Sequence, residues 1–484
     1  MHLTAHDHHA HYAISAPAAA RACATLLTCA LWALTATARA DGAHAAAPTS
    51  GNRVTPAAGN IVADGPAVWT LDAVVERAVA TYPAVQAAHA NVRAAAAGVG
   101  LARSAYLPRI GLSGAYQRQD PVATFTLPSA SGAPHEVAIA PHDVYDAHLG
   151  VEQQIYDFGR TRARVDEAKA GERAAQTGAD QVREGVALDA VRGFYAALFL
   201  AVSAKVERDV IARFEEAKRV AVERREHGVG TDFEVLQTET RISAAESRLV
   251  SIESARRNAL TGLRSLLGLP ASARLDLSGS LDHTREAQDP SALVERAERL
   301  RPELQVARAE LARAKDAARS ARASDNPTLG VSAQAGVRDG YPIDVTKAHF
   351  NSLVGAQLTV PLFDGTARRG AKVAAARVEA AAADAERTRR EVDTEVRQAY
   401  ENLQASFAEL ESATAQATQA AQAGELARTR YKAGTITNLD LLDAETTLAQ
   451  ARLGQARVSY DILLRQSALH HAVGDLLATL AGRR

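Results

Sequence analysis

The pattern of hydrophobic and polar positions predicts two unusually long helices. From Gly159 to about His227, and again from Thr366 to about Lys432, hydrophobic residues step by three and four and no proline interrupts them. This spacing is typical of coiled-coil helices. About 67 residues at a rise of 1.5 Å give a helix of roughly 100 Å, whereas helices in globular proteins average about 11–12 residues. A glycine turn after each long helix leads into a returning helix.

Four shorter segments alternate between hydrophobic and polar residues. In the first, Ile110, Leu112 and Tyr116 share one parity, while the residues between them are mostly polar or small. Such alternation predicts strands with one apolar and one polar face. The four strands are expected at about 107–118, 147–157, 326–338 and 350–363. Polar loops containing proline and glycine, at about 120–144 and 339–349, join the strands of each pair.

The two halves of the chain also match in sequence. Val75-Glu76-Arg77-Ala78 recurs as Val294-Glu295-Arg296-Ala297, and Gly228 with Glu239 recurs as Gly434 with Glu445. Each copy is too long for a solenoid unit of about 20–50 residues, so we expect one internal duplication. The expected order in each copy is helix, two strands, long helix and return helix. Repeat 1 covers residues 67–268, a linker covers 269–289 and repeat 2 covers 290–484.

The N-terminal segment predicts export. An apolar run from Ala22 to Ala38 follows Arg21 and ends in Ala38-Arg39-Ala40, as in a secretory signal peptide. We therefore expect residues 1–40 to be the signal peptide, and residues 41–66, rich in alanine, proline and glycine, to form a flexible N-terminal arm.

Composition fits long helices and argues against nucleic-acid binding. The formal net charge is −1, so there is no basic footprint. Hydrophobic residues make up 47% of the chain but aromatic residues only 5%, because alanine supplies much of the apolar count. Alanine is the strongest helix former.

The four strands suggest a membrane barrel shared between chains. Strands of about ten residues with one apolar face have the length and pattern of outer-membrane barrel strands. Four strands cannot close a barrel, and open strand edges are not tolerated in lipid. Three chains giving twelve strands is the simplest closed arrangement, although the strand count alone leaves other multiples open.

The order of elements and several local motifs resemble the TolC-like outer-membrane efflux proteins over roughly residues 70–480. The motifs are Tyr156-Asp157-Phe158-Gly159, Phe363-Asp364-Gly365, Tyr431-Lys432-Ala433-Gly434 and Leu441-Leu442-Asp443-Ala444. The resemblance implies a mixed α and β membrane protein, a homotrimer in the outer membrane of a Gram-negative bacterium. Its twelve-stranded β-barrel would continue into a long periplasmic α-helical coiled-coil barrel.

The resemblance also implies a function. Such proteins are not enzymes but passive exit ducts of tripartite efflux pumps, and their partners are a periplasmic adaptor protein and an inner-membrane transporter. Type I protein secretion uses the same kind of duct and remains an alternative. An exported coiled-coil scaffold without a barrel would explain the helices but not the strands. We find no nucleophile–base constellation for an enzyme and expect no cofactor and no metal site.

Asp440 and Asp443 are the candidate gate residues. They are three residues apart and so share one helix face. Both match a ring of aspartates that forms the periplasmic constriction of the family, where the resemblance implies six carboxylates in a trimer. Such a ring favours cations. A structural alternative stays open, because Thr437 and Asp440, like Thr231 and Glu234, also have the spacing of a capping box.

The resemblance further implies a lock at the closed end. Tyr431 and Glu234 match two of the positions that hold it, whereas Ile436 stands where the family has an arginine. We therefore expect the end of the tunnel to open more easily than in proteins that keep the arginine.

Aromatic and basic residues flank the strand-to-helix junctions. Tyr156, Phe158 and Phe363, with Arg160 and Arg368 nearby, are predicted to anchor the protein at the interface with the outer-membrane lipid. The alternative is a solvated helix start. Asp157 and Asp364 are expected to cap the long helices.

Overall fold

The computed structural model describes residues 68–127, 132, 135–138, 140–285, 288–339 and 349–481. The predicted signal peptide and N-terminal arm therefore lie outside the described residues. So does most of the second predicted loop.

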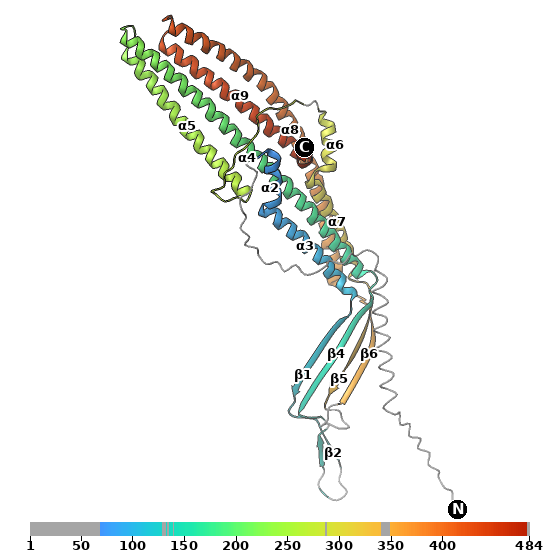
Figure 1. Cartoon of the computed structure of the whole chain (residues 1–484). Coiled ribbons are helices and arrows are strands. Elements are labelled where there is room, and N and C mark those ends of the chain that lie inside the picture. Colours follow the sequence, from blue (N-terminus) through green and yellow to red (C-terminus); the bar gives the residue numbers. More distant parts are fainter. Residues whose placement is uncertain are drawn as a thin grey trace, which may run out of the picture. The chain divides into compact units, whose positions relative to one another are not determined.

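The same order of elements occurs twice along the chain (Figure 1). The first half contains α2 (Leu71–Thr81), α3 (Pro83–Arg103), the one-turn helix η1 (Ser104–Tyr106), β1 (Arg109–Arg118), β4 (Asp143–Tyr156), α4 (Arg160–Glu226) and α5 (Asp232–Leu266). The second half contains α6 (Pro290–Leu300), α7 (Pro302–Ala323), β5 (Thr328–Arg338), β6 (His349–Thr359), α8 (Gly365–Lys432), α9 (Asn438–Val473) and α10 (Leu476–Ala481).

Proline and glycine set the helix boundaries. Pro83 and Pro302 occupy the first turns of α3 and α7, where a missing N–H costs nothing, so the helix predicted before each strand pair is divided in two. Gly228 and Gly434 follow the long helices in the left-handed region, with φ of 74° and 71°. Gly474 ends α9 in the same way, with φ of 84°. The return helix therefore stops at Val473, and a separate short helix follows.

The four long strands form one antiparallel sheet in the order β1-β4-β5-β6. Leu112 pairs with Leu149, Leu149 with Ala335, and Ala335 with Ser352. One face is predominantly apolar and largely exposed in the single chain; Leu112 on that face is 81% exposed. The other face carries polar side chains such as Glu152 and Gln334. β1 and β6 are the two edges of the sheet.

Two strands differ from their predicted bounds by several residues. β4 begins at Asp143, several residues earlier than expected, because it pairs with β1 as far as Arg118. β6 ends at Thr359 rather than near Phe363, since Pro361 has no N–H to continue the ladder. The first predicted loop contains a small hairpin of β2 (Thr124–Leu127) and β3 (His135–Ala138).

Two antiparallel helix pairs, α4 with α5 and α8 with α9, form the helical part (Figure 1). Their shared core near the turns includes Phe214, Tyr431 and Leu442. Farther from the turns, α2 and the linker cover a second core around Phe194. By length and composition α4 could cross a membrane, but half of its most apolar window is buried, as in the core helix of a bundle.

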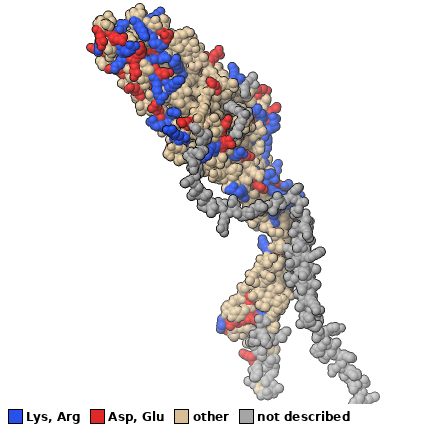
Figure 2. Space-filling view, in the orientation of Figure 1, with Lys and Arg blue, Asp and Glu red and all other residues tan. Residues whose placement is uncertain are grey.

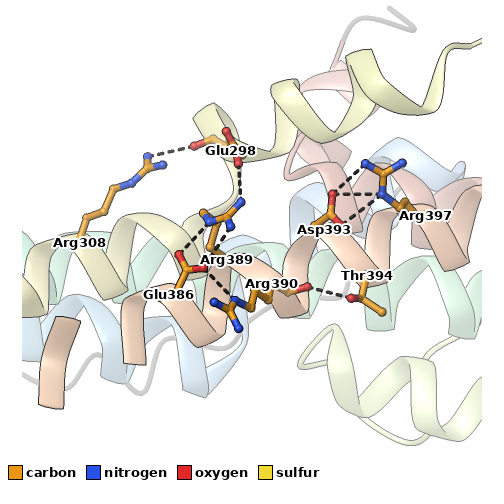
Figure 3. A network of polar contacts seen from close by, with 8 residues as sticks. All are labelled: Glu298, Arg308, Glu386, Arg389, Arg390, Asp393, Thr394 and Arg397. Carbon is orange, nitrogen blue, oxygen red and sulfur yellow. Dashed lines mark hydrogen bonds and ion pairs between the residues drawn. The ribbon is translucent and has the colours of Figure 1, made fainter. Parts of the chain in front are cut away.

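Charged side chains connect α6 to α8 beside these cores (Figure 3). Glu298 of α6 lies 3.5 Å from Arg389 of α8, and Arg389 also pairs with Glu386 at 2.9 Å. Figure 2 shows charged side chains gathered over the helices, whereas most of the visible surface of the sheet is uncharged. In this view charge is therefore concentrated on the helical part and sparse on the sheet.

Candidate functional site

The turns that end the two long helices lie side by side. We call the turns 227–231 and 433–437, together with the first residues of α5 and α9, the paired turns (Figure 1). Asn438 joins them, because its Nδ2 donates to the carbonyl oxygen of Glu234 at 3.1 Å and to Oγ1 of Thr238 at 3.0 Å. Since Asn438 is buried, the start of α9 is held firmly against the start of α5.

Asp440 completes a capping box at the start of α9. The backbone N–H of Asp440 donates to Oγ1 of Thr437 at 3.2 Å, and the Thr437 backbone N–H donates to Oδ2 of Asp440 at 2.9 Å. The Thr437 hydroxyl, which donates to Oδ2 of Asp440 at 2.7 Å, and the Thr437 backbone N–H both lower the pKa of the Asp440 carboxyl. The capping interpretation of Asp440 is therefore correct. It leaves the carboxylate ionised and exposed, so it does not prevent a role in lining an opening.

Glu234 does not form the reciprocal half of such a box. Its backbone N–H donates to Oγ1 of Thr231 at 3.3 Å. Its side-chain Oε2, however, is buried and has no hydrogen-bond partner among the described residues. The capping-box interpretation is therefore wrong for Glu234, since only the hydroxyl of Thr231 caps α5.

Asp443 has a different environment from Asp440. It lies one turn further along α9, where the helix backbone needs no cap. Its side chain is 61% exposed, and Oδ1 lies 3.4 Å from Nη2 of Arg241 on α5. Sequence reasoning did not anticipate this cation, because the two residues lie about 200 positions apart along the chain.

Tyr431 packs under an arginine that sequence reasoning missed. Its side chain is 1% exposed, and the guanidinium carbon of Arg224 lies 5.2 Å from its ring centre. The Tyr431 hydroxyl has no hydrogen-bond partner among the described residues, so it does not bond to Glu234. Burial and the charge of Glu234 raise the pKa of Tyr431. The structure thus brings the two predicted lock residues close together without a hydrogen bond between their side chains.

The internal repeat could have identified Arg224. Arg224 precedes Gly228 by the same distance as Arg430 precedes Gly434, so both copies carry an arginine at the end of the long helix. Ile436, in the place of the expected arginine, is half-buried and packs against the core around Tyr431. An isoleucine at this position therefore contributes packing, and the cation beside Tyr431 comes from the other turn.

A buried carboxylate joins three helices just beyond the paired turns. Glu445 of α9 is 2% exposed. Its Oε2 accepts a hydrogen bond from Arg213 of α4 at 3.0 Å, and its Oε1 accepts one from Arg428 of α8 at 2.5 Å. In the sequence, Glu445 stands out only as a repeated position, equivalent to Glu239. Sequence reasoning could not assign its partners, because they depend on how the helices are rotated against each other.

At the other end of α4 and α8, the predicted aromatic anchors are exposed. The rings of Tyr156 and Phe158 are in edge contact, with centroids 4.6 Å apart. Phe363 is 77% exposed, and the guanidinium of Arg368 lies over its ring at 5.2 Å. Asp364 is the N-cap of α8 and accepts a hydrogen bond from the backbone N–H of Thr366, as predicted. In α4 the N-cap position is taken by Gly159, and Asp157, two residues earlier, accepts from the backbone N–H of Thr161.

Arg160, predicted as a basic anchor, contacts the segment that follows α7. Its guanidinium donates to the backbone oxygens of Ser324 and, at 2.8 Å, of Asn326. It therefore satisfies carbonyl groups beyond the end of α7 and joins the two halves of the chain.

A second group of aromatic residues was not predicted as an anchor. Tyr116 and Tyr145 lie opposite each other on the apolar face of the sheet, at the end far from the helices, with ring centres 5.0 Å apart. Phe350 of β6 is exposed on the same face. The alternation of the strands, combined with their aromatic ends, was the signal that could have identified this group.

Within the described residues there is no cluster of three or more histidine, cysteine, aspartate or glutamate side chains that could hold a metal ion. The charged groups at and near the paired turns are carboxylates and arginines, which can attract or repel ions.

Comparison with known proteins agrees with this arrangement. The family model described as outer membrane efflux protein matches residues 74–269 and 293–475, which together exceed half of the chain. The chain is 27% identical to Protein CyaE of Bordetella pertussis over 410 residues, covering 83% of each protein. It is also 27% identical to the alkaline protease secretion protein AprF of Pseudomonas aeruginosa over 391 residues, covering 78% of each.

Solved structures share the fold. The Campylobacter jejuni CmeC outer membrane channel aligns with a TM-score of 0.71 at 18% identity, over 84% of this chain and 86% of that one. The open state of the Neisseria gonorrhoeae MtrE outer membrane channel aligns with a TM-score of 0.70 at 20% identity, over 84% and 89%. The predicted resemblance to TolC-like proteins is confirmed, and with it the location in the outer membrane. This chain belongs to the outer membrane efflux protein family, whose members are channels rather than enzymes.

Proposed function

We propose that three copies of this chain form a closed duct across the outer membrane. The observation that carries the proposal is the four-stranded sheet, which has an exposed apolar face and two open edges, β1 and β6. Open edges are not tolerated in lipid. Because the sheet is antiparallel with an even number of strands, β6 of one copy can pair with β1 of the next in the same antiparallel sense. Three copies give twelve strands.

The duplicated order of elements supports a matching helical tunnel. Each half contributes one long helix and one return helix, so three copies give twelve helices in the periplasm. The apolar band of the sheet, with aromatic side chains at both ends, sets the position of the membrane. In this arrangement Tyr156, Phe158, Phe363, Arg160 and Arg368 lie at the periplasmic interface, and the paired turns lie at the far end of the tunnel.

The paired turns are the proposed gate. Asp440 and Asp443 of three copies would place six carboxylates at the narrow end, a charge that favours cations. Tyr431 and Glu234 belong to the contacts that keep the turns together. Tyr431 acts through its ring, which packs under Arg224. Glu234 acts through its backbone carbonyl, which accepts from Asn438.

The transport role is that of the passive outer-membrane component of a tripartite efflux pump, which receives substrates from an inner-membrane transporter through a periplasmic adaptor. A second candidate is protein secretion. It is favoured by the similarity to a relative whose name describes alkaline protease secretion, AprF, along 78% of both chains.

Two measurements test the proposal. The protein from outer-membrane fractions is expected to migrate as a trimer that heating dissociates, and a soluble monomer would contradict the duct. In planar bilayers the double variant Asp440→Asn/Asp443→Asn is expected to lose cation preference. An unchanged preference would exclude the acidic ring and leave the duct intact. Cysteine crosslinking from the paired turns in cells, followed by identification of the captured adaptor, then separates efflux from protein secretion.

A further inference from the structure

The two proposed gate carboxylates differ in their neighbours. Nη2 of Arg241 on α5 donates to Oδ1 of Asp443 at 3.4 Å. The polar contacts that the structure gives the side chain of Asp440 are with Thr437, which carries no charge. Asp443 therefore lies beside a compensating cation, whereas Asp440 presents a full negative charge.

We propose that Arg241 is a selectivity-determining residue that masks the charge of Asp443, so that Asp440 supplies most of the fixed negative charge at the opening. This inference rests on the proposed function, in which both aspartates line the narrow end of the duct. It adds a residue from the other helix pair to the set that determines which ions pass.

Masking does not require a strong ion pair. The side chains of Arg241 and Asp443 are 41% and 61% exposed, and exposed pairs contribute little to stability. A cation this close nevertheless reduces the field of the carboxylate to that of a small dipole, which falls off faster with distance than the field of a single charge. At about 0.1 M salt, charges act on ions within roughly 10 Å, which is the scale of a narrow opening.

The neighbouring carboxylates Glu239 and Glu445 are already paired with other cations. Glu239, on the same helix, pairs with Lys218 at 2.7 Å. Glu445, on the same helix as Asp443, is buried between two arginines. Among the described residues, Arg241 is the cation that the structure places against Asp443, so its removal leaves that carboxylate uncompensated.

The repeat shows that the pair is particular to one of two equivalent positions. Where repeat 2 has Asp443, repeat 1 has Gln237, and where repeat 1 has Arg241, repeat 2 has Thr447. The equivalent contact would therefore join two uncharged side chains. The same helix packing is therefore compatible with uncharged side chains at these two positions, so we expect charge-removing substitutions of Arg241 and Asp443 to leave the packing unchanged.

Reversal potentials of purified trimers in planar bilayers, under a gradient of potassium chloride, test the proposal. Arg241→Gln is expected to raise the ratio of cation to anion permeability by about twofold to fivefold, because Asp443 is unmasked. Arg241→Lys keeps the charge and is expected to match the unmodified protein. Arg241→Gln/Asp443→Asn removes both charges and is expected to return the ratio close to its original value. Arg257→Gln, an equal charge change farther along α5, serves as the control and is expected to have no effect.

An unchanged ratio in Arg241→Gln would overturn the masking. Asp440→Asn, measured in the same series, then shows whether the acidic ring also fails: a lowered ratio keeps the ring, and an unchanged ratio rejects both. If Arg241→Gln does not assemble into trimers, the exchanged pair Arg241→Asp/Asp443→Arg replaces it. The exchanged pair preserves the net charge and is expected to keep the original ratio, and a changed ratio overturns the proposal.

Discussion

Nη1 of Arg224 donates to the carbonyl oxygen of Tyr431 at 3.3 Å, while the guanidinium carbon lies 5.2 Å from the centre of the Tyr431 ring. This contact joins the end of α4 to the end of α8. A cation over an aromatic ring contributes roughly 0.5–1 kcal/mol when exposed and about 2 kcal/mol when desolvated. Arg224 thus supplies, from the other turn, a cation beside Tyr431 that the residue at position 436 does not provide.

Removing Arg224 is expected to loosen the paired turns. Arg224→Ala loses the ring contact and the hydrogen bond, so we predict a higher open probability in single-channel recordings. Tyr431→Phe serves as the comparison. Because the Tyr431 hydroxyl is buried without a partner among the described residues, its removal is expected to be neutral or slightly stabilising. Opening by Tyr431→Phe to the same extent as by Arg224→Ala would show that the hydroxyl, rather than the ring, holds the turns.

Glu445 is expected to be the most sensitive charged residue near the turns. Glu445→Gln leaves Arg213 and Arg428 facing a neutral side chain, and breaking a buried ion pair typically costs about 3–5 kcal/mol. We predict a clear fall in the midpoint of thermal unfolding, measured by circular dichroism in detergent. Glu425, whose exposed carboxylate also pairs with Arg428, provides the matched control, and Glu425→Gln is expected to have a small effect. Equal effects of the two variants would contradict the role of burial.

The two faces of the sheet are expected to tolerate charge differently. Leu112→Arg places a charge on the apolar face near the middle of β1, where it costs about 2–4 kcal/mol in a membrane barrel. Gln334→Arg places the same charge on the polar face of β5 and is expected to be tolerated. The yield of heat-modifiable trimers in the outer membrane distinguishes the variants. Similar losses from both would contradict the assignment of the faces.

The duplication predicts a contact between chains. Arg241 and Asp443 meet within one chain, so the equivalent residues Thr447 and Gln237 are expected to meet across neighbouring chains of a closed ring. A short bismaleimide crosslinker is therefore expected to join Gln237→Cys/Thr447→Cys into dimers and trimers. The same reagent on Arg241→Cys/Asp443→Cys is expected to react within each chain and leave monomers after heating. Monomers alone from the first variant would exclude this ring.

The network between α6 and α8 gives a prediction for pH (Figure 3). Hydrogen bonds from Arg389 and Arg390 lower the pKa of Glu386 to about 2. Because this value lies below the unfolded value of about 4.3, Glu386 stabilises the folded chain above that pH, and the contribution is lost as the pH falls toward 2.

Glu386→Gln is therefore expected to lower the thermal midpoint slightly at pH 7, with a difference that shrinks as the pH falls from about 4.5 to 2. The effect is small because the group is exposed. Glu379→Gln, elsewhere on the exposed surface of α8, removes the same charge without touching the network and serves as the matched control. A constant difference for Glu386→Gln across this range would contradict the pKa assignment.

Local sequence patterns predicted most of the fold. The long helices, the four strands and their order in each half follow from periodicity and from prolines and glycines, which act over a few residues. The errors lie where pairing or packing decides a boundary. Asp143 is in a strand because β1 extends opposite it.

The candidate site was only partly predictable from the sequence, because the contacts between its helices depend on tertiary packing. Asp440, Asp443, Tyr431 and Glu234 were identified from a motif, and the structure gathers all four at the paired turns. Their partners Arg241 and Arg224 were not identified, although the repeat carried a signal for Arg224.

The sequence by itself determined the secondary structure, its duplicated order and the residues at the turns, because these depend on local spacing. Only the tertiary structure decided which charges meet: Arg241 with Asp443, Arg224 with Tyr431, and Glu445 with two arginines. Hydrophobic periodicity specifies which face of a helix is buried. It does not specify the rotation and stagger of one helix against another, and a salt bridge between helices depends on both.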